Sequence, residues 1–247
     1  MAYLVQVGEI TLLMGRAVRE GVRRGVPIRE LLRQLDQLGV QSLSIVTITS
    51  MFAGMVLTLQ AAHSLEHFGA QHLVAQVVSL SLLREMGPVL TALVLAGRVG
   101  AGITAELGSM AVTEQVDAVR ALGASPVHRL VLPRLVAILI MLPLLTIIAD
   151  AVGLLGGAII AWAEMGQLPS AFWSSAFQAA DWDDVLSGLG KALFFGGFIG
   201  LIGCHAGLRA TGGADGVGRA TTGAVVAASI SIFVSDFLLT KLFLLLP

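Results

Sequence analysis

Apolar residues gather in five stretches of the chain, and more polar segments separate them. The stretches run over about 36–63, 73–97, 135–163, 185–208 and 221–246. A helix needs about 20 mostly apolar residues to cross a hydrocarbon core of about 30 Å. The pattern predicts an all-α, polytopic membrane protein with about five transmembrane helices, because a helix satisfies its own backbone hydrogen bonds in lipid.

The first 37 residues follow a different pattern. Over 14–38, apolar residues recur at near-helical spacing and six arginines stand between them. This is typical of an amphipathic helix on an anionic membrane surface; a solvated cytoplasmic helix is the alternative. Gly25 and Pro27 predict a break in this helix. We therefore divide the chain into an N-terminal interfacial element, 1–37, and a transmembrane domain, 38–247.

Arginine and lysine are unevenly distributed among the connections. The segments before the first span, between the second and third, and between the fourth and fifth contain arginine, whereas 63–72 and 164–184 contain neither residue. The positive-inside rule then predicts a cytoplasmic N-terminus and an outside C-terminus. All connections agree with this orientation, which favours an odd number of spans.

Two of the cytoplasmic connections have features of their own. The region 98–134 is long and amphipathic, and it carries four arginines. We expect a partner protein to contact it from the cytoplasm. The segment 207–223 is rich in glycine and predicts a flexible loop, capped by Thr221 or Thr222 at the start of the last span.

Composition supports the membrane assignment and excludes other classes. Hydrophobic residues make up 56% of the chain and charged residues 13%, against about 25% charged in an average soluble domain. The basic residues form no continuous patch with interleaved aromatics, so nucleic-acid binding has no support. The single cysteine, Cys204, lies in an apolar run, and we interpret it as a structural thiol.

Charged residues inside the spans are the main candidates for function. They are Arg84, Glu85, Asp150, Lys191 and Asp236, and Lys241 lies near the end of the last span. At 1.5 Å per residue, four of them lie about 21–27 Å from the nearest cytoplasmic arginine, in the outer half of the membrane. Such residues usually face a bundle interior or a wet cavity.

We interpret Arg84, Glu85, Lys191 and Asp236 as lining a polar cavity. The alternative is a set of buried ion pairs that only fix helix packing, and for Asp150 we prefer this alternative. Arg84 and Glu85 point about 100° apart on a helix, so we expect their partners on other helices.

Two motifs resemble catalytic or nucleotide sites. His63, Glu66 and His67 form the H-x-x-E-H pattern of some zinc peptidases, but they stand in a short outside loop. Gly213–Arg219 resembles a phosphate loop but lacks its lysine and its serine or threonine. We expect no catalytic residue, no metal site and no resident cofactor; if the protein uses ATP, another chain supplies it.

Glycines recur at helix-packing spacing in the third and fourth spans. They are Gly153, Gly157, Gly196, Gly200, Gly203 and Gly207. Small residues four apart let helix backbones approach closely. The stripes predict either tight packing within one protomer or a homodimer contact.

Several sequence pieces together are specific to one family. LREMGPV, AGRVGAG, TAELG and TEQ lie between 82 and 115, and AADWDD and GRATTGAVV follow at 179–184 and 218–226. Over about residues 40–245 the chain resembles the MlaE/YrbE family of ABC transporter permeases. The resemblance implies a homodimeric all-helical core in the bacterial inner membrane, with lipid bound in a cavity at the dimer interface.

The resemblance also implies partners and residue roles. The partners are a cytoplasmic ABC ATPase that binds the ATP, a periplasmic MCE-domain protein and often a STAS-domain protein. Together they move phospholipids or related hydrophobic molecules between membranes. Glu114 and Gln115 match the ATPase coupling region, and the four intramembrane charges other than Asp150 match positions near the lipid pocket.

A rival class is an ATP-independent secondary transporter or channel that uses the Glu85 and Asp236 carboxylates. The sequence shows no convincing inverted repeat, which argues against this class. Neither the lipid species nor the direction of transport follows from the sequence.

Overall fold

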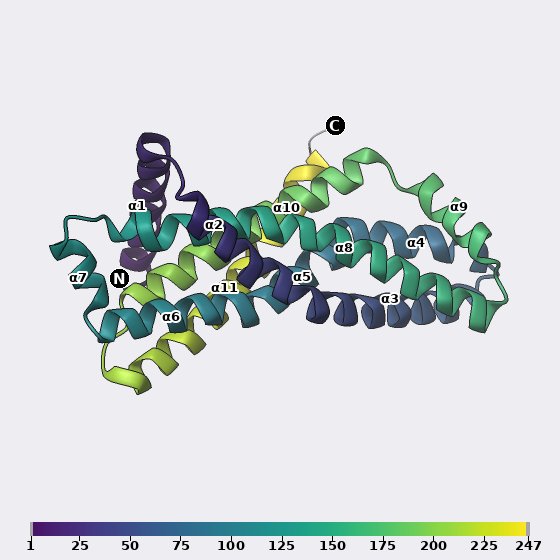
Figure 1. The fold of residues 1–247 in the computed structure, drawn as a ribbon. Helices are drawn as coiled ribbons and strands as arrows, with labels where there is room; N and C mark the ends of the chain where they lie inside the picture. Colours follow the sequence, from purple (N-terminus) through teal and green to yellow (C-terminus); the bar gives the residue numbers. More distant parts are fainter. Residues whose placement is uncertain (1, 246–247) are drawn as a thin grey trace. The chain divides into compact units, whose positions relative to one another are not determined.

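The computed structural model describes residues 2–245, and the regular structure of this part is helical (Figure 1). The predicted outer limits of the two domains, Met1 and Pro247, and the predicted end of the last span, Leu246, lie outside the described residues. Five helical segments are long and apolar enough to cross a membrane: Ile28–Glu66, Gln71–Val112, Val127–Met165, Trp182–Leu208 and Gly213–Phe243. The predicted all-α, five-span architecture is therefore confirmed.

The helices form two compact units, and each unit takes three segments of the chain. Unit 1 comprises Met1–Ser42, Leu95–Met141 and Phe194–Ser235, and unit 2 comprises Leu43–Val94, Leu142–Leu193 and Asp236–Pro247. The long helices α8 (Leu132–Met165), α10 (Trp182–Leu208) and α11 (Gly213–Leu245) each contribute to both units.

Unit 1 begins with the predicted broken helix. Helix α1 (Ala2–Arg24) ends before Gly25, whose φ of 72° lies in the left-handed region that favours glycine, and α2 (Ile28–Gln34) starts directly after Pro27. The break is confirmed, although α1 begins earlier than expected. Helix α2 then continues through a π turn (Leu35–Gly39) and a 3-10 turn (Val40–Ser42) toward the first span.

The region 98–134 differs from the expected loop. A π turn (Ala96–Gly100) and α6 (Ala101–Val112) extend the second span, so the span takes up the first part of this region as far as Val112. Ile103 and Leu107 of α6 are buried. Helix α7 (Gln115–Ala121) and its two connections form the actual turn, before a further π turn (Val127–Val131) leads into α8.

The predicted flexible loop after the fourth span is wrong. Helix α10 ends at Leu208 and α11 begins at Gly213, so only four residues connect them. Gly216 of this stretch serves close packing, as does Gly108 of α6 beside Val217, whereas Gly218 and Gly223 meet nothing within 4 Å. A Cβ on Gly216 would lie 1.7 Å from the carbonyl oxygen of Thr211, and one on Gly108 would lie 3.2 Å from Val217.

The glycine stripes pack against helices of the same protomer. In unit 1, a Cβ on Gly207 would lie 2.9 Å from the Thr104 carbonyl oxygen, and one on Gly200 would lie 3.0 Å from Ile138. The Thr104 hydroxyl also contacts the Gly203 carbonyl oxygen at 3.1 Å. Packing within one protomer therefore accounts for the α10 stripe, and the homodimer stays a prediction.

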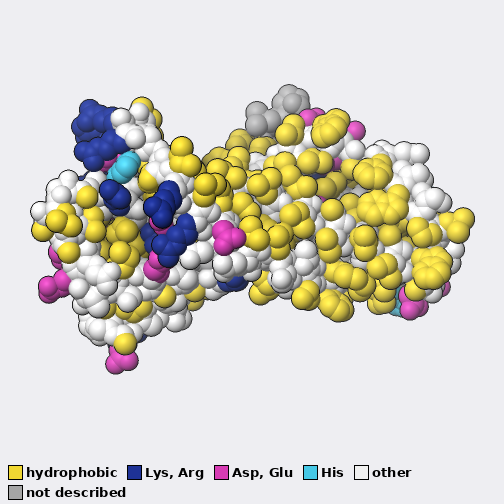
Figure 2. All heavy atoms as spheres, in the orientation of Figure 1, with side chains coloured by type: hydrophobic (Ala, Val, Ile, Leu, Met, Phe, Trp, Pro, Cys, Tyr) yellow, Lys and Arg dark blue, Asp and Glu magenta, His cyan; other side chains and the backbone are white. Residues whose placement is uncertain are grey.

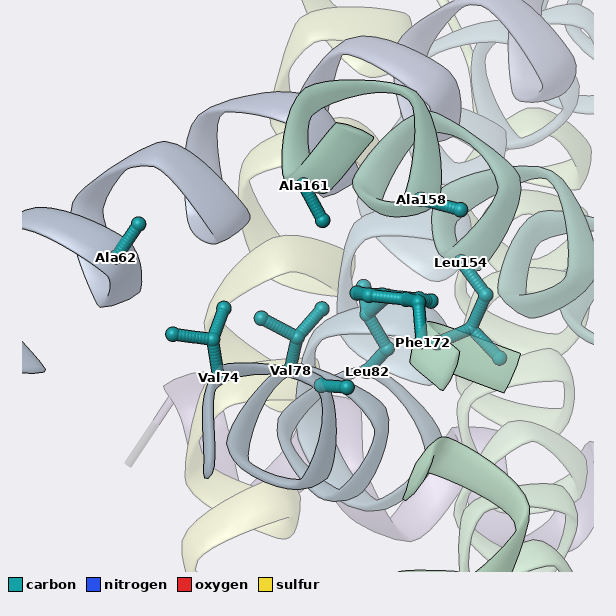
Figure 3. Close-up of a cluster of buried hydrophobic side chains, with 9 residues drawn as sticks. Ala62, Val74, Val78, Leu82, Leu154, Ala158, Ala161 and Phe172 are labelled. Carbon is teal, nitrogen blue, oxygen red and sulfur yellow. The ribbon is translucent and has the colours of Figure 1, made fainter. Parts of the chain in front are cut away.

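Unit 2 contains α3 (Leu43–Glu66), a 3-10 turn (Gln71–Leu73), α4 (Val74–Ser81), a π turn (Leu82–Met86), α5 (Gly87–Leu95) and α9 (Pro169–Ala179). Figure 3 shows part of its core, in which side chains from α3, α4, α8 and α9 point toward one another. Sequence patterning treated α9 as part of a loop. It is an amphipathic helix that buries Phe172 and Ala176, and it packs against α4.

The outer surfaces of the two units differ in chemistry. Hydrophobic side chains cover much of the visible surface of unit 2, and Lys and Arg side chains gather on that of unit 1 (Figure 2). Exposed apolar residues on α3 include Ile48, Phe52, Val56 and Leu59. Such a surface is typical of contact with lipid.

Candidate functional site

The four charged residues predicted as a group all belong to unit 2. Arg84 and Glu85 lie in the π turn Leu82–Met86, Lys191 lies in α10, and Asp236 lies in α11. The structure brings Glu85 and Asp236 together on Lys191. The Arg84 side chain pairs with Asp184 instead, although the Arg84 carbonyl oxygen accepts a hydrogen bond from Lys191.

The Lys191 ammonium is the centre of this charge cluster. Its Nζ donates to Glu85 Oε2 at 2.6 Å, to the Thr240 hydroxyl at 2.7 Å and to the Arg84 carbonyl oxygen at 3.0 Å. An ammonium has three N–H donors, so these bonds use all of them. Lys191 is only 2% exposed. The Lys191 ammonium therefore has no N–H donor left for a ligand.

Asp236 and Thr240 complete the cluster from α11. Asp236 Oδ1 lies 3.1 Å from Lys191 Nζ, which is an ion-pair distance. This oxygen accepts no hydrogen bond from any described residue. The Thr240 hydroxyl lies 3.1 Å from Glu85 Oε1 and 2.8 Å from the Asp236 carbonyl oxygen. Two carboxylates and one ammonium sum to a formal charge of −1, so the cluster offers no net attraction to an anion.

The backbone of the second span explains why Lys191 belongs here. Pro88 has no N–H, so the carbonyl oxygen of Arg84 has no donor four residues later. Lys191 fills this vacancy across the helix interface. Because of Pro88, the Arg84 carbonyl oxygen lacks its usual helical donor, and the ammonium of Lys191 in α10 donates to it instead.

Arg84 pairs with Asp184, at the start of α10. Its Nε donates to Asp184 Oδ1, and the backbone N–H of Asp181 donates to Asp184 Oδ2 at 3.0 Å. Asp184 is almost fully buried, whereas the Arg84 side chain is 49% exposed. The four N–H bonds on its terminal nitrogens have no partner among the described residues.

Asp150 stands apart from the cluster. Its Oδ1 is buried without a partner among the described residues, and a Cβ on Gly87 would lie 1.7 Å from it. Glycine is thus required where the π turn meets α5. The ion pair that we expected for Asp150 does not form with any described residue; its carboxyl instead contacts Gly87, in the stretch of the second span that follows Arg84 and Glu85.

The predicted coupling residues lie in unit 1 at the start of α7. Glu114 has a φ of 61°, the only positive φ of a non-glycine residue between 2 and 245. Gln115 donates to the Thr113 hydroxyl at 3.0 Å, and both Glu114 and Gln115 are exposed. Buried Val116 anchors the helix, and Gly123, with a φ of 74°, follows its end.

Sequence reasoning missed two members of the site, Asp184 and Thr240. Both carry a periodicity signal: Asp184 lies seven residues before Lys191, and Thr240 lies four after Asp236, so each pair shares a helix face. The expected cavity around the four charges stays a prediction. The zinc hypothesis gains no support, since no group of three possible metal ligands occurs among the described residues.

These features define a class: a polytopic helical membrane protein whose helices hold a cluster of paired charges around one buried lysine. The chain belongs to the MlaE permease family, because the family model described as Permease MlaE matches residues 31–242. The expected family resemblance is thus confirmed.

Individual relatives support the same assignment. A probable ABC transporter permease protein of Rickettsia prowazekii is 43% identical over 96% of this chain and 92% of its own length. The intermembrane phospholipid transport system permease protein MlaE of Haemophilus influenzae is 39% identical over 90% of this chain and 84% of its own length. The chloroplastic protein TRIGALACTOSYLDIACYLGLYCEROL 1 of Arabidopsis thaliana is 37% identical over 95% and 67%, respectively.

Proposed function

We propose that this chain is the permease subunit of an ATP-driven transporter that moves phospholipids or related hydrophobic molecules between the inner and outer membranes of a bacterium. The observation that carries the proposal is the match to the MlaE family over residues 31–242. The name of the Haemophilus relative indicates phospholipid as cargo, and the name of the Rickettsia relative indicates the ABC transporter class. In this proposal the chain is not an enzyme, and a partner chain binds and hydrolyses ATP.

The charge cluster divides into two roles in this proposal. Lys191 holds Glu85 and Asp236 across three helical segments, and it has no N–H left for a ligand. Arg84 is half exposed and keeps its terminal guanidinium nitrogens free among the described residues. A guanidinium matches a phosphate in charge and geometry. Arg84 therefore meets the lipid headgroup, and Lys191 positions the turn that carries it.

Helix α7 is the proposed contact with the ATPase. It is short, it exposes Glu114 and Gln115, and the neighbouring Leu122 is 85% exposed. A polar helix end beside an exposed leucine suits docking into a groove of a partner protein. The other proposed partners are a second copy of this chain, a periplasmic MCE-domain protein and a STAS-domain protein.

A paired substitution at Arg84 tests the headgroup role. Arg84→Gln alone would leave Asp184 as a buried, uncompensated carboxylate. The double variant Arg84→Gln/Asp184→Asn replaces the ion pair by neutral hydrogen-bonding groups, so it should retain the fold and the ATP hydrolysis of the purified complex. We expect lipid transfer between donor and acceptor vesicles to fall by at least about tenfold, the loss of one charge-assisted contact.

The matched control is Lys241→Gln, which removes an exposed cation from α11 in the same unit. It should leave lipid transfer unchanged. If the Arg84→Gln/Asp184→Asn variant transfers lipid at the normal rate, Arg84 does not contact the headgroup.

The secondary-transporter alternative is tested with the chain alone. Vesicles containing only this protein should show no flux driven by a pH gradient, because Glu85 and Asp236 are both held by Lys191. Flux without ATP and without a partner would contradict the ABC assignment. Copurification of an ATPase from the native host at normal expression would support it.

A further inference from the structure

Unit 1 contains a cavity of about 560 Å³ beside α7, far in sequence from the charge cluster. Its walls come from α2, α6, the α7 segment, the π turn Val127–Val131 and α8. The charged residues that line it are Glu30, Arg33, Glu106, Arg129 and Arg134. Three cations and two anions give the wall a formal charge of +1.

The two acidic residues of this cavity already have partners. Glu106 pairs with Arg134 at 2.8 Å, and Glu30 accepts a hydrogen bond from Gln34 at 3.0 Å. Arg33 and Arg129 are exposed and form no ion pair with any described residue. The Gln34 amide leaves the negative charge of Glu30 in place, so Arg33, Arg129 and Glu30 together leave one net positive charge for a ligand.

Arg134 leaves one buried donor in this wall without an acceptor in the described part of the chain. Its side chain is only 3% exposed, its Nη2 contacts Glu106, and its Nη1 donates to the Leu130 carbonyl oxygen at 2.6 Å. Its buried Nε–H has no partner among the described residues. A buried donor without an acceptor is costly. An anion in the adjoining cavity would compensate this guanidinium.

The surroundings of the cavity indicate where the anion comes from. On α2, Ile28 and Leu32 are exposed by 70% and 60%, in the same turns as Arg29 and Arg33. An exposed apolar face next to arginines is typical of a helix at a membrane surface with anionic lipids. The cavity therefore opens beside a segment suited to the headgroup region.

We propose that this cavity binds the phosphate group of an anionic phospholipid, held by Arg33 and Arg129 and backed by Arg134. Guanidinium groups bind phosphate oxygens in pairs of charge-assisted hydrogen bonds. The site is separate from the proposed transport site around Arg84. Free phosphate has the same binding chemistry, so the experiment separates the two sources.

Occupancy of this cavity would also act on α7. Val119 and Leu122 form part of the wall, so a bound headgroup would fix the segment that we propose as the ATPase contact. This consequence rests on the proposed function, whereas the binding site itself does not. Anionic lipid bound in this cavity would then hold α7 in the conformation that contacts the ATPase.

Native mass spectrometry of the purified full-length chain tests the binding site. The protein is titrated with phosphatidylglycerol and, separately, with phosphatidylcholine, in the same detergent. We expect a clear preference for phosphatidylglycerol. The double variant Arg33→Gln/Arg129→Gln should weaken its binding by about tenfold for each arginine. Both residues are exposed, so the variant should retain its fold.

Arg19→Gln/Arg23→Gln is the matched control, because it removes two exposed arginines of α1 that do not line the cavity. Equal loss of binding in both variants, or no preference over phosphatidylcholine, would overturn the site. Competition with millimolar inorganic phosphate identifies the source: displacement assigns the site to free phosphate, and persistence of the lipid assigns it to the headgroup. Since the assay needs no ATPase, its failure is distinct from failure of the transport proposal.

Discussion

Lys191 of unit 2 and two arginines of unit 1, Arg33 and Arg129, lie in opposite environments. In unit 2, Lys191 is buried and donates all three N–H bonds to protein oxygens. In unit 1, Arg33 and Arg129 are exposed beside a cavity and have no ion-pair partner among the described residues. The buried cation Lys191 of unit 2 is thus neutralised internally, as is Arg134 of unit 1, whereas Arg33 and Arg129 stay at the surface.

The difference separates structural charges from charges that can bind a ligand. A buried ion pair costs desolvation and repays it only with well-formed hydrogen bonds, and the Lys191 cluster provides these. An unpaired surface arginine costs little and keeps its donors. Arg84 of unit 2 lies between the two cases, because its Nε is paired with Asp184 while half of its side chain is exposed.

Removing the central cation should have the largest effect. Lys191→Met would leave Glu85 and Asp236 without their shared partner and the Arg84 carbonyl oxygen without a donor. We expect a loss of about 3–5 kcal/mol in the free energy of unfolding, as for other buried pairs broken on one side. Denaturant titration in detergent micelles, followed by tryptophan fluorescence, measures it.

The triple variant Lys191→Met/Glu85→Gln/Asp236→Asn should recover much of this loss, since it leaves no unpaired charge. Arg129→Gln in unit 1 should stay close to the parent protein in stability, as do most surface substitutions. Equal effects of Lys191→Met and Arg129→Gln would remove the distinction between the two units.

A smaller loss is expected where the second span contacts Asp150. A Cβ on Gly87 would lie 1.7 Å from Asp150 Oδ1 and 2.9 Å from the Leu82 carbonyl oxygen. Gly87→Ala should therefore destabilise the protein by about 1–3 kcal/mol, the usual cost of overpacking. Thermal unfolding in detergent gives the shift.

Gly97→Ala is the control in unit 1, because a Cβ there meets nothing within 4 Å. It should be neutral or slightly stabilising, as alanine favours a helix by up to about 1 kcal/mol over glycine. Adding Asp150→Ala to Gly87→Ala should relieve part of the clash. If Gly97→Ala is as harmful as Gly87→Ala, local packing around Asp150 is not the cause.

The sequence was a good guide to spans and intramembrane charges, since both follow from composition over long windows. It also indicated that Arg84 and Glu85 find partners on other helices, and the structure confirms Asp184 and Lys191, both on α10. The sequence did not show which charged residues pair with one another. Whether Lys191 faces a cavity or Glu85 depends on how α10 is rotated against the π turn, and single-helix periodicity does not fix that rotation.

The errors in the connections have separate physical causes. Glycine is typical of flexible loops and of close helix contacts alike, so the glycine-rich start of α11 was taken for a loop. The short amphipathic helix α9 was missed because only Phe172 and Ala176 are buried along its 11 residues. The cavity at Arg134 also escaped prediction, because its walls come from five separate segments.

The smallest effect is expected at Glu114, where strain and contact can be separated. A non-glycine residue at a φ of 61° costs about 1 kcal/mol relative to glycine. Glu114→Gly should therefore stabilise the permease by up to about 1 kcal/mol in thermal unfolding, although it removes an exposed carboxylate of the proposed ATPase contact. Gly123→Ala, at a φ of 74°, should destabilise the other end of the α7 segment by a similar amount.

Recovery of the ATPase on the tagged permease distinguishes the two roles of Glu114. If the carboxylate contacts the ATPase, Glu114→Gly yields a more stable chain that retains less ATPase, whereas Glu114→Asn relieves part of the strain with the same loss of charge. A more stable Glu114→Gly chain with full ATPase recovery would assign the left-handed residue to the local turn alone. A less stable chain would mean that the left-handed backbone at Glu114 carries no strain that glycine relieves.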